Sequence, residues 1–166
     1  MDHINSAGTL NNIGEVYREQ GKYPEAISWY ERALKIFERE FGVDHINSAN
    51  TIMNIGSVYS AQGKYAEAIS WYERALKIKE REFGVDHVNS AITLHTIGLV
   101  YKNMDDWMSA KSYFERAARL HRQCPGDHHE FTIGSERELT NAINSLNKDS
   151  PSTTKTKWWK LSNRRK

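Results

Sequence analysis

The chain has 166 residues, of which 39% are hydrophobic and 27% charged, a composition typical of one globular domain. It contains no apolar run near the roughly 18 residues that cross a bilayer. Its single cysteine, Cys124, excludes an intrachain disulfide, and its first ten residues lack the basic start and apolar run of a secretory signal. The sequence therefore favours a cytoplasmic protein.

Charge is unevenly distributed along the chain. Residues 151–166 contain six basic residues and no acidic one. Subtracting them from the 23 basic residues leaves 17 against 21 acidic residues, so the rest of the chain carries a net charge of −4. The acidic body and the basic tail are therefore separate segments, and we expect residues 149–166 to form a disordered tail.

The body is a tandem repeat with a period of 42 residues. Residues 2–43 and 44–85 align without a gap and differ at eight positions, and residues 86–127 form a third, more divergent copy. A partial fourth copy follows over residues 128–148. Repeats of this length are typical of solenoids, in which each unit buries its apolar face against its neighbours.

Each copy predicts a pair of helices. In the first copy, apolar residues from Leu10 to Tyr17 recur at the spacing of one helix face, and Gly21 then favours a helix end. A second helix is predicted over residues 24–41, where apolar positions again recur at helical spacing. The next two copies repeat this pair.

A single capping helix is expected over residues 128–148, with its pattern most evident from Glu136 to Asn147. Its polar residues Arg137, Asn141 and Asn144, with Glu136, would face solvent while the other side covers the third repeat. At the opposite end, nothing in this sequence precedes the first helix. Its apolar face is therefore expected to be partly uncovered.

The repeated positions resemble the tetratricopeptide repeat (TPR) family. In the first copy the resemblance is carried by Leu10, Ile13, Gly14, Tyr17, Gly21, Tyr23, Ala26, Tyr30 and Ala33. The 42-residue period and phrases such as LNNIG and RALKI are most similar to the kinesin light chain and nephrocystin subtype. The resemblance implies an all-α, right-handed solenoid of three helix pairs over residues 2–127, followed by a capping helix. No heptad segment is present and DHIN replaces the subtype's HP, so cargo transport does not carry over.

Differences between the first two copies concentrate in the first helix. Six of the eight lie between positions 8 and 19, and most of them project to one side of the helix. The resemblance implies that first helices line a concave surface that holds a peptide, with Asn12 and Asn54 at positions that hold a peptide backbone. The predicted groove consists of Asn11, Asn12, Glu15, Arg18, Glu19, Asn50, Met53, Asn54, Ser57, Ser60, Ile92, His95, Thr96, Leu99, Lys102 and Asn103.

The type of peptide is constrained by what the groove lacks. A clamp for the terminal carboxylate of a chaperone tail would need basic residues on the third first helix, where Ile92 and Thr96 stand instead. The groove is polar at one end and apolar near Met53 and Leu99. This pattern favours an extended or helical peptide with one or two apolar anchors.

No catalytic residue, metal site or cofactor is predicted. His3, His45 and His87 recur at the repeat period, which indicates loop structure rather than one metal cluster. The stretch CPGDHH from Cys124 to His129 resembles half of a zinc site, but no second ligand pair follows at finger spacing. Phosphate-binding glycine loops and nucleophile motifs are absent, so the sequence does not predict an enzyme.

The sequence therefore predicts a non-catalytic scaffold that binds a peptide segment of a partner protein. One alternative is a structural spacer or homo-oligomer that self-associates through the uncovered first repeat. Another is a part of a larger protein whose basic tail contacts nucleic acid or membrane weakly, with NRRK as a nuclear signal.

Overall fold

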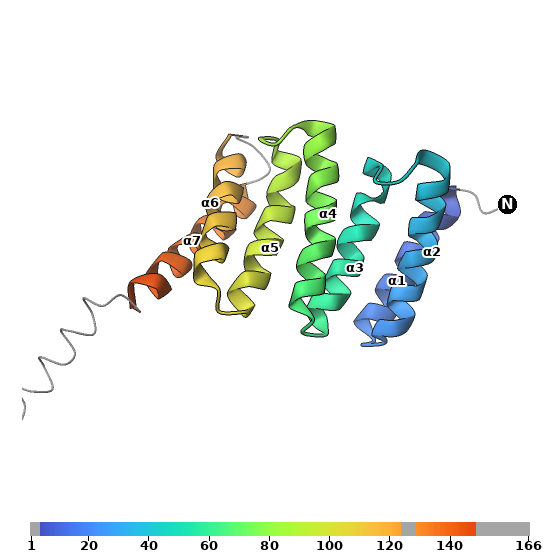
Figure 1. The fold of residues 1–166 in the computed structure, drawn as a ribbon, viewed down its shortest axis with the longest axis horizontal. Helices are drawn as coiled ribbons and strands as arrows, with labels where there is room; N and C mark the ends of the chain where they lie inside the picture. Colours follow the sequence, from blue (N-terminus) through green and yellow to red (C-terminus); the bar gives the residue numbers. More distant parts are fainter. Residues whose placement is uncertain (1–3, 124–128, 149–166) are drawn as a thin grey trace, which may run out of the picture.

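Three antiparallel helix pairs and one closing helix form a row in this computed structural model, which describes residues 4–123 and 129–148 (Figure 1). The helices are α1 (Ile4–Glu19), α2 (Tyr23–Phe41), α3 (Ala49–Ala61), α4 (Tyr65–Phe83), α5 (Ala91–Asn103), α6 (Trp107–Arg122) and α7 (His129–Lys148). Two 3₁₀ turns, η1 (Ile46–Ser48) and η2 (Val88–Ser90), precede α3 and α5. The described residues contain no strand, which confirms the predicted all-α repeat solenoid.

The helix boundaries follow from local backbone requirements. Gly21, with φ +71°, and Gly42, with φ +93°, occupy conformations that side chains disfavour, at the ends of α1 and α2. Pro24 lies in the first turn of α2, where its missing N–H removes no helical hydrogen bond. In the third copy Asp105 takes the glycine position with φ +58°.

Within each pair, a glycine on the first helix lies against an aromatic ring on the second. A Cβ atom built on Gly14 would lie 2.7 Å from the ring of Tyr30, and one on Gly98 would lie 2.6 Å from the ring of Phe114. Only glycine permits this separation, because real Cβ contacts are longer. The small residue therefore sets how closely the two helices of a pair approach.

Successive pairs pack through the second helix of one pair and both helices of the next. The first of these junction cores contains Ala26, Tyr30, Leu34, Ala49, Ile52, Ile55, Val58, Ala75 and Ile78, and the second contains Ala68, Tyr72, Leu76, Ala91, Leu94, Ile97, Val100, Ala117 and Leu120. Met53 and Tyr59 pack against both of these cores, so successive junctions are linked as expected of stacked repeats.

The closing helix α7 runs from His129 to Lys148, and it packs mainly on α6 with further contacts to α5. Ser135, a polar residue of this helix, is fully buried. Arg137, Asn141 and Asn144 are exposed, as expected, whereas Glu136 is half-buried.

Candidate functional site

Two of the predicted groove residues lie between successive first helices. The Asn11 amide donates a hydrogen bond of 2.9 Å to the Thr51 hydroxyl on α3. One repeat later, the Met53 sulfur lies 3.4 Å from the Thr93 hydroxyl on α5. Lys79, on α4, donates to the same hydroxyl at 3.0 Å. The first two junctions therefore place different chemistry at the same structural position.

The third junction carries two histidines at the corresponding positions. His95 Nδ1 lies 3.0 Å from the Ser135 hydroxyl on α7, and His121 Nδ1 lies 3.3 Å from the same hydroxyl. Burial lowers the pKa of His95, and Lys102 adds to this effect while Glu138 opposes it. His95, predicted as a groove residue, thus joins the third repeat to the closing helix.

A polar network joins the helices of the first pair. Glu15 accepts a hydrogen bond of 2.7 Å from the Tyr30 phenol and is ion-paired with Arg18. The hydrogen bond from Arg18 lowers the pKa of Glu15 despite partial burial, while burial and then the Glu15 contact raise the pKa of Tyr30. In the second pair Ser57 replaces the acid and bonds the carbonyl oxygen of Asn54 at 2.8 Å.

Two further predicted residues make contacts within the fold. Leu99 packs against the apolar cluster that contains Phe114. Lys102 forms an ion pair of 2.7 Å with Glu138 on α7. Both residues therefore help to hold the third pair and the closing helix together.

The other predicted groove residues lie along the first helices, exposed or half-buried. Exposed are Asn12, Glu19, Asn50, Ile92 and Asn103, and half-buried are Asn54, Ser57, Ser60 and Thr96. Thr96 bonds the carbonyl oxygen of Ile92 at 2.9 Å within its own helix. Peptide binding by this set stays a prediction.

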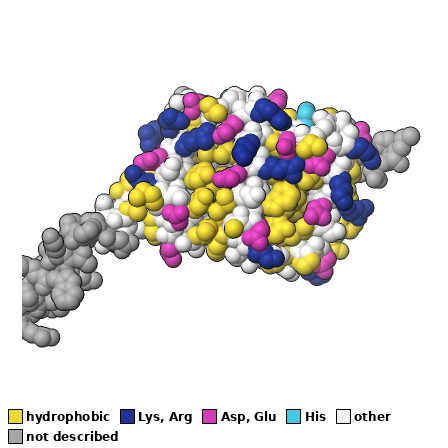
Figure 2. All heavy atoms as spheres, in the orientation of Figure 1, with side chains coloured by type: hydrophobic (Ala, Val, Ile, Leu, Met, Phe, Trp, Pro, Cys, Tyr) yellow, Lys and Arg dark blue, Asp and Glu magenta, His cyan; other side chains and the backbone are white. Residues whose placement is uncertain are grey.

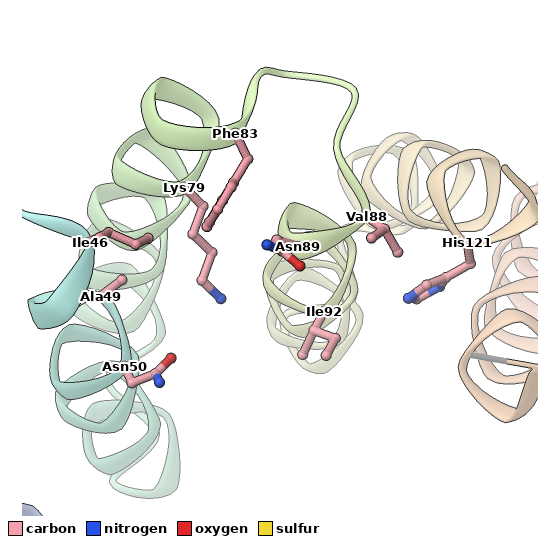
Figure 3. A pocket seen from close by; sticks show the side chains of 9 residues that line it. All are labelled: Ile46, Ala49, Asn50, Lys79, Phe83, Val88, Asn89, Ile92 and His121. Carbon is pink, nitrogen blue, oxygen red and sulfur yellow. The ribbon is translucent and has the colours of Figure 1, made fainter. Parts of the chain in front are cut away.

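A cavity of about 320 Å³ opens at the amino-terminal ends of α3 and α5 (Figure 3). Its walls are Ile46, Ala49, Asn50, Lys79, Phe83, Val88, Asn89, Ile92 and His121. Asn50 and Ile92 belong to the predicted groove, whereas the other lining residues were not predicted as site residues. The cavity thus extends the predicted surface toward α4 and the 3₁₀ turns.

Lys79 differs from the other residues of this cavity because it carries a charge that has no counter-charge among the described residues. Figure 3 shows its side chain reaching from α4 into the space between α3 and α5. The ammonium contacts the Thr93 hydroxyl and, at 3.2 Å, the Met53 sulfur, and no carboxylate of the described residues pairs with it. Burial lowers the pKa of Lys79, as expected for a cation that has lost water without gaining a counter-charge. Phe37 stands at this position in the first copy, and this difference between copies is the sequence signal for the site.

The repeated histidines have a structural role in the loops. The Nδ1 atoms of His45 and His87 each accept a hydrogen bond of 3.2 Å from the backbone N–H two residues later, at the start of η1 and η2. Within residues 4–123 and 129–148, no three His, Cys, Asp or Glu side chains could hold a metal ion together. The CPGDHH stretch lies outside the described residues, apart from the backbone of His129.

The family is decided by sequence comparison. The model of the tetratricopeptide repeat family matches residues 5–81 and, in an overlapping placement, residues 47–123. The chain belongs to the TPR family. No curated protein shows significant sequence similarity to it.

Solved structures share the TPR fold at low sequence identity. A Podosopora anserina protein described as a kinesin light chain with nearly identical TPR-like repeats is 18% identical, with a TM-score of 0.75 over 89% of this chain and 70% of that one. BtubC (BKLC) from P. vanneervenii is 19% identical, with a TM-score of 0.78 over 86% of this chain and 57% of that one. The Sgt2 TPR domain from Aspergillus fumigatus is 19% identical, with a TM-score of 0.63 over 86% and 80% of the two chains. These neighbours show that the chain has the TPR fold, and they include kinesin light chain-like proteins.

The surface formed by α2, α4 and α6 shows no single-sign charge field. Figure 2 shows basic and acidic side chains interleaved with apolar ones over these helices. None of the described helices is long and apolar enough to cross a membrane. The basic tail, residues 149–166, lies outside the described residues.

Proposed function

We propose that this TPR chain is a non-catalytic scaffold that binds a peptide segment of a partner protein along α1, α3 and α5. Arrays of helical repeats offer extended surfaces of this kind because each repeat contributes one helix to a shared face. The exposed amides on the first helices suit a peptide backbone, since an amide offers both donors and an acceptor. TPR domains are in general interaction modules, which supports this reading over an enzyme.

We further propose that the cavity around Lys79 receives an acidic side chain of the peptide next to an apolar one. The observation that carries this proposal is the half-buried ammonium of Lys79, whose partners in the fold are uncharged. A carboxylate entering the cavity would supply the missing counter-charge. Ile92, 42% exposed, and Phe83, 40% exposed, would contact the adjacent apolar side chain.

Selection from a random peptide library tests the proposal. The full chain and a Lys79→Phe variant, which carries the residue of the first copy, would each be panned against the same library. We expect the full chain to enrich peptides with Asp or Glu beside an apolar residue, and Lys79→Phe to lose this enrichment. Lys77→Phe, on the exposed side of the same helix, serves as the control and should enrich the same peptides as the full chain.

Two results of these binding experiments would contradict the proposal. Equal enrichment of the same peptides by the full chain and Lys79→Phe would show that the cavity does not contribute to binding. Binding that survives combined alanine substitutions at Asn12, Asn54 and Leu99 would show that the predicted groove is not the binding site.

Two alternative functions, binding through the basic tail and self-association through the first repeat, lead to different experimental results. Weak, salt-sensitive binding of nucleic acid or anionic vesicles that disappears on deletion of residues 151–166 would favour the tail as the functional segment. A dimer that Leu10→Glu disrupts would favour self-association through the first repeat.

A further inference from the structure

Two hydrogen-bond donors converge on the thioether sulfur of Met53. The Lys79 ammonium lies 3.2 Å from this sulfur, and the Thr93 hydroxyl lies 3.4 Å from it. The ammonium also donates to the Thr93 hydroxyl at 3.0 Å, so the three polar atoms form a triangle where the second and third repeats meet. Because a thioether sulfur is a weak acceptor, both donors point at an atom that satisfies them poorly.

The surroundings of the triangle make this poor match costly. Thr93 is fully buried, and Lys79 and Met53 are half-buried. Met53 packs against both junction cores, which hold its side chain in place. Burial lowers the pKa of Lys79, and no carboxylate of the described residues pairs with its ammonium. A strong acceptor added at the sulfur would therefore gain two donors without breaking an ion pair.

The other two junctions have polar side chains at the position of Met53. Asn11 takes this position at the first junction, where its amide donates to the Thr51 hydroxyl at 2.9 Å. His95 takes it at the third junction, where its Nδ1 atom lies 3.0 Å from the Ser135 hydroxyl. The position therefore accommodates a polar group that contacts the hydroxyl of the following repeat.

We propose that Met53 is a site of reversible oxidation, at which hydrogen peroxide converts the thioether to a sulfoxide that Lys79 and Thr93 bind. The sulfur attacks one peroxide oxygen, so that an S–O bond forms and the O–O bond breaks. The other oxygen leaves as water with both peroxide hydrogens. Sulfur is oxidised by two electrons, which reduce the peroxide. The sulfoxide oxygen then accepts hydrogen bonds from the two donors that now meet the sulfur.

The triangle offsets the usual cost of this modification. A sulfoxide ordinarily disrupts a packed core, because it replaces an apolar group with a polar one. At Met53 the sulfoxide oxygen gains a hydrogen bond from an ammonium, and such charge-assisted bonds are about twice as strong as neutral ones. Met104 and Met108 differ, since they are 45% and 68% exposed and water solvates a sulfoxide there. Oxidation of Met53 should therefore preserve or raise stability as long as Lys79 is present.

Oxidation would also change the cavity around Lys79. The sulfoxide would hold the ammonium that the acidic side chain of a peptide needs, so acidic peptides should bind the oxidised chain more weakly. This consequence alone rests on the proposed function. The modification itself is tested through stability, so failure of the peptide proposal would leave it standing.

The test compares two proteins that differ only at Lys79. The parent is the full chain with Met104→Leu, Met108→Leu and Cys124→Ser, which leave Met53 and Met1 as its sulfur-containing residues. Its partner adds Lys79→Phe, the residue of the first copy, and Lys79→Leu replaces this change if the phenylalanine variant does not fold. Hydrogen peroxide is applied to the folded proteins, and peptide mass spectrometry measures the sulfoxide at Met53. Methionine sulfoxide reductases for both epimers then reverse the modification.

Thermal unfolding before and after oxidation gives the result. We expect oxidation to lower the Tm of the Lys79→Phe partner and to leave that of the parent unchanged or higher. The two shifts should differ by at least about 3 °C, and reduction should abolish both. Met53→Leu in the parent is the matched control, and its Tm should not respond to peroxide. Met53→Gln, whose amide oxygen resembles the sulfoxide, should cost less stability with Lys79 present than with Lys79→Phe.

Two results would overturn this inference. One is a pair of Tm shifts that differ by less than this amount, or a larger loss in the parent, since the sulfoxide would then gain nothing from the ammonium. The other is a Met53 that peroxide oxidises only at temperatures at which the chain unfolds. The sulfur would then be closed to oxidants in the native state.

Discussion

Tyr30 and Glu15 face each other across the first helix pair, and the phenol of Tyr30 donates a hydrogen bond of 2.7 Å to the carboxylate of Glu15. In the third pair the same two positions hold Phe114 and Leu99, and both belong to an apolar cluster. A hydroxyl and its acceptor have thus been replaced together. The first and third copies thus each have a matched pair at these positions, whereas the second copy keeps Tyr72 and replaces the acid with Ser57.

Tyr30→Phe should reduce the free energy of unfolding by about 1 kcal/mol, because Glu15 loses a donor. Adding Glu15→Leu should recover part of this loss, since it recreates the pair of the third repeat. Urea unfolding of the single and double variants measures both effects. Equal stability of the wild type and Tyr30→Phe would contradict the role given to this hydrogen bond.

The same network predicts a dependence on acid pH. The pKa of Glu15 is lowered from its ordinary value of 4.5, so its ionised form stabilises the fold at neutral pH. This contribution should fade as pH falls below that value and through the lowered pKa. Glu15→Gln should therefore lose less stability than the wild type on acidification, measured by thermal unfolding. An equal loss of thermal stability in the wild type and Glu15→Gln would argue against a stabilising role of ionised Glu15.

Acidification should also loosen the junction between the third repeat and the closing helix. Burial lowers the pKa of His95 below 6.5, so the unfolded chain binds more protons than the folded one just below that pH. Stability should therefore fall as pH decreases through about 6.5. His95→Gln should show a smaller fall between about pH 7.5 and about pH 5.5, by thermal unfolding. An unchanged pH dependence in this variant would be evidence against a neutral, buried His95.

Gly56→Ala should destabilise the fold, by about 1–3 kcal/mol, because the new Cβ would meet a packed ring. That atom would lie 2.9 Å from the ring of Tyr72. Gly8→Ala is the matched control, since nothing lies within 4 Å of its Cβ, and alanine there should stabilise α1 by up to about 1 kcal/mol. Chemical denaturation compares the two, and equal effects would contradict the close approach of α3 and α4.

Asp105→Gly should stabilise the chain by roughly 1 kcal/mol. Asp105 has φ +58° at the turn between α5 and α6, where the first two copies have glycine. The reverse change, Gly63→Asp, should cost a similar amount because Gly63 has φ +73°. Thermal unfolding of both variants decides this, and a loss of stability in Asp105→Gly would show that the aspartate side chain is needed there.

The helix pairs were predictable because their determinants repeat within each copy. The apolar spacing of Leu10 to Tyr17, the stop at Gly21 and the start at Pro24 are all local, and each appears where it was expected. The burial of Ser135 in α7 was not predictable in this way. Its hydroxyl lies against two histidines, and apolar periodicity does not signal such a polar contact.

The groove was only partly predictable because a position that differs between copies can either face a ligand or contact the neighbouring helix. Asn11 and Met53 differ, yet each reaches the threonine of the following repeat, which lies 40 residues away in sequence. A helix projection shows the side of the helix but not the neighbour that covers it. Lys79 was not predicted as a site residue because most differences between the copies lie in the first helices, although Lys79 replaces Phe37 between otherwise similar second helices.

The Lys79 cavity is tested most directly by a double-mutant cycle on binding. A peptide selected by the full chain, and its Glu-to-Gln or Asp-to-Asn counterpart, would be titrated calorimetrically into the wild type and into Lys79→Phe. We predict that removing the peptide acid weakens binding to the wild type about tenfold and leaves binding to Lys79→Phe almost unchanged. Equal losses in both proteins would show that the acid and Lys79 act independently, and would contradict the proposed site.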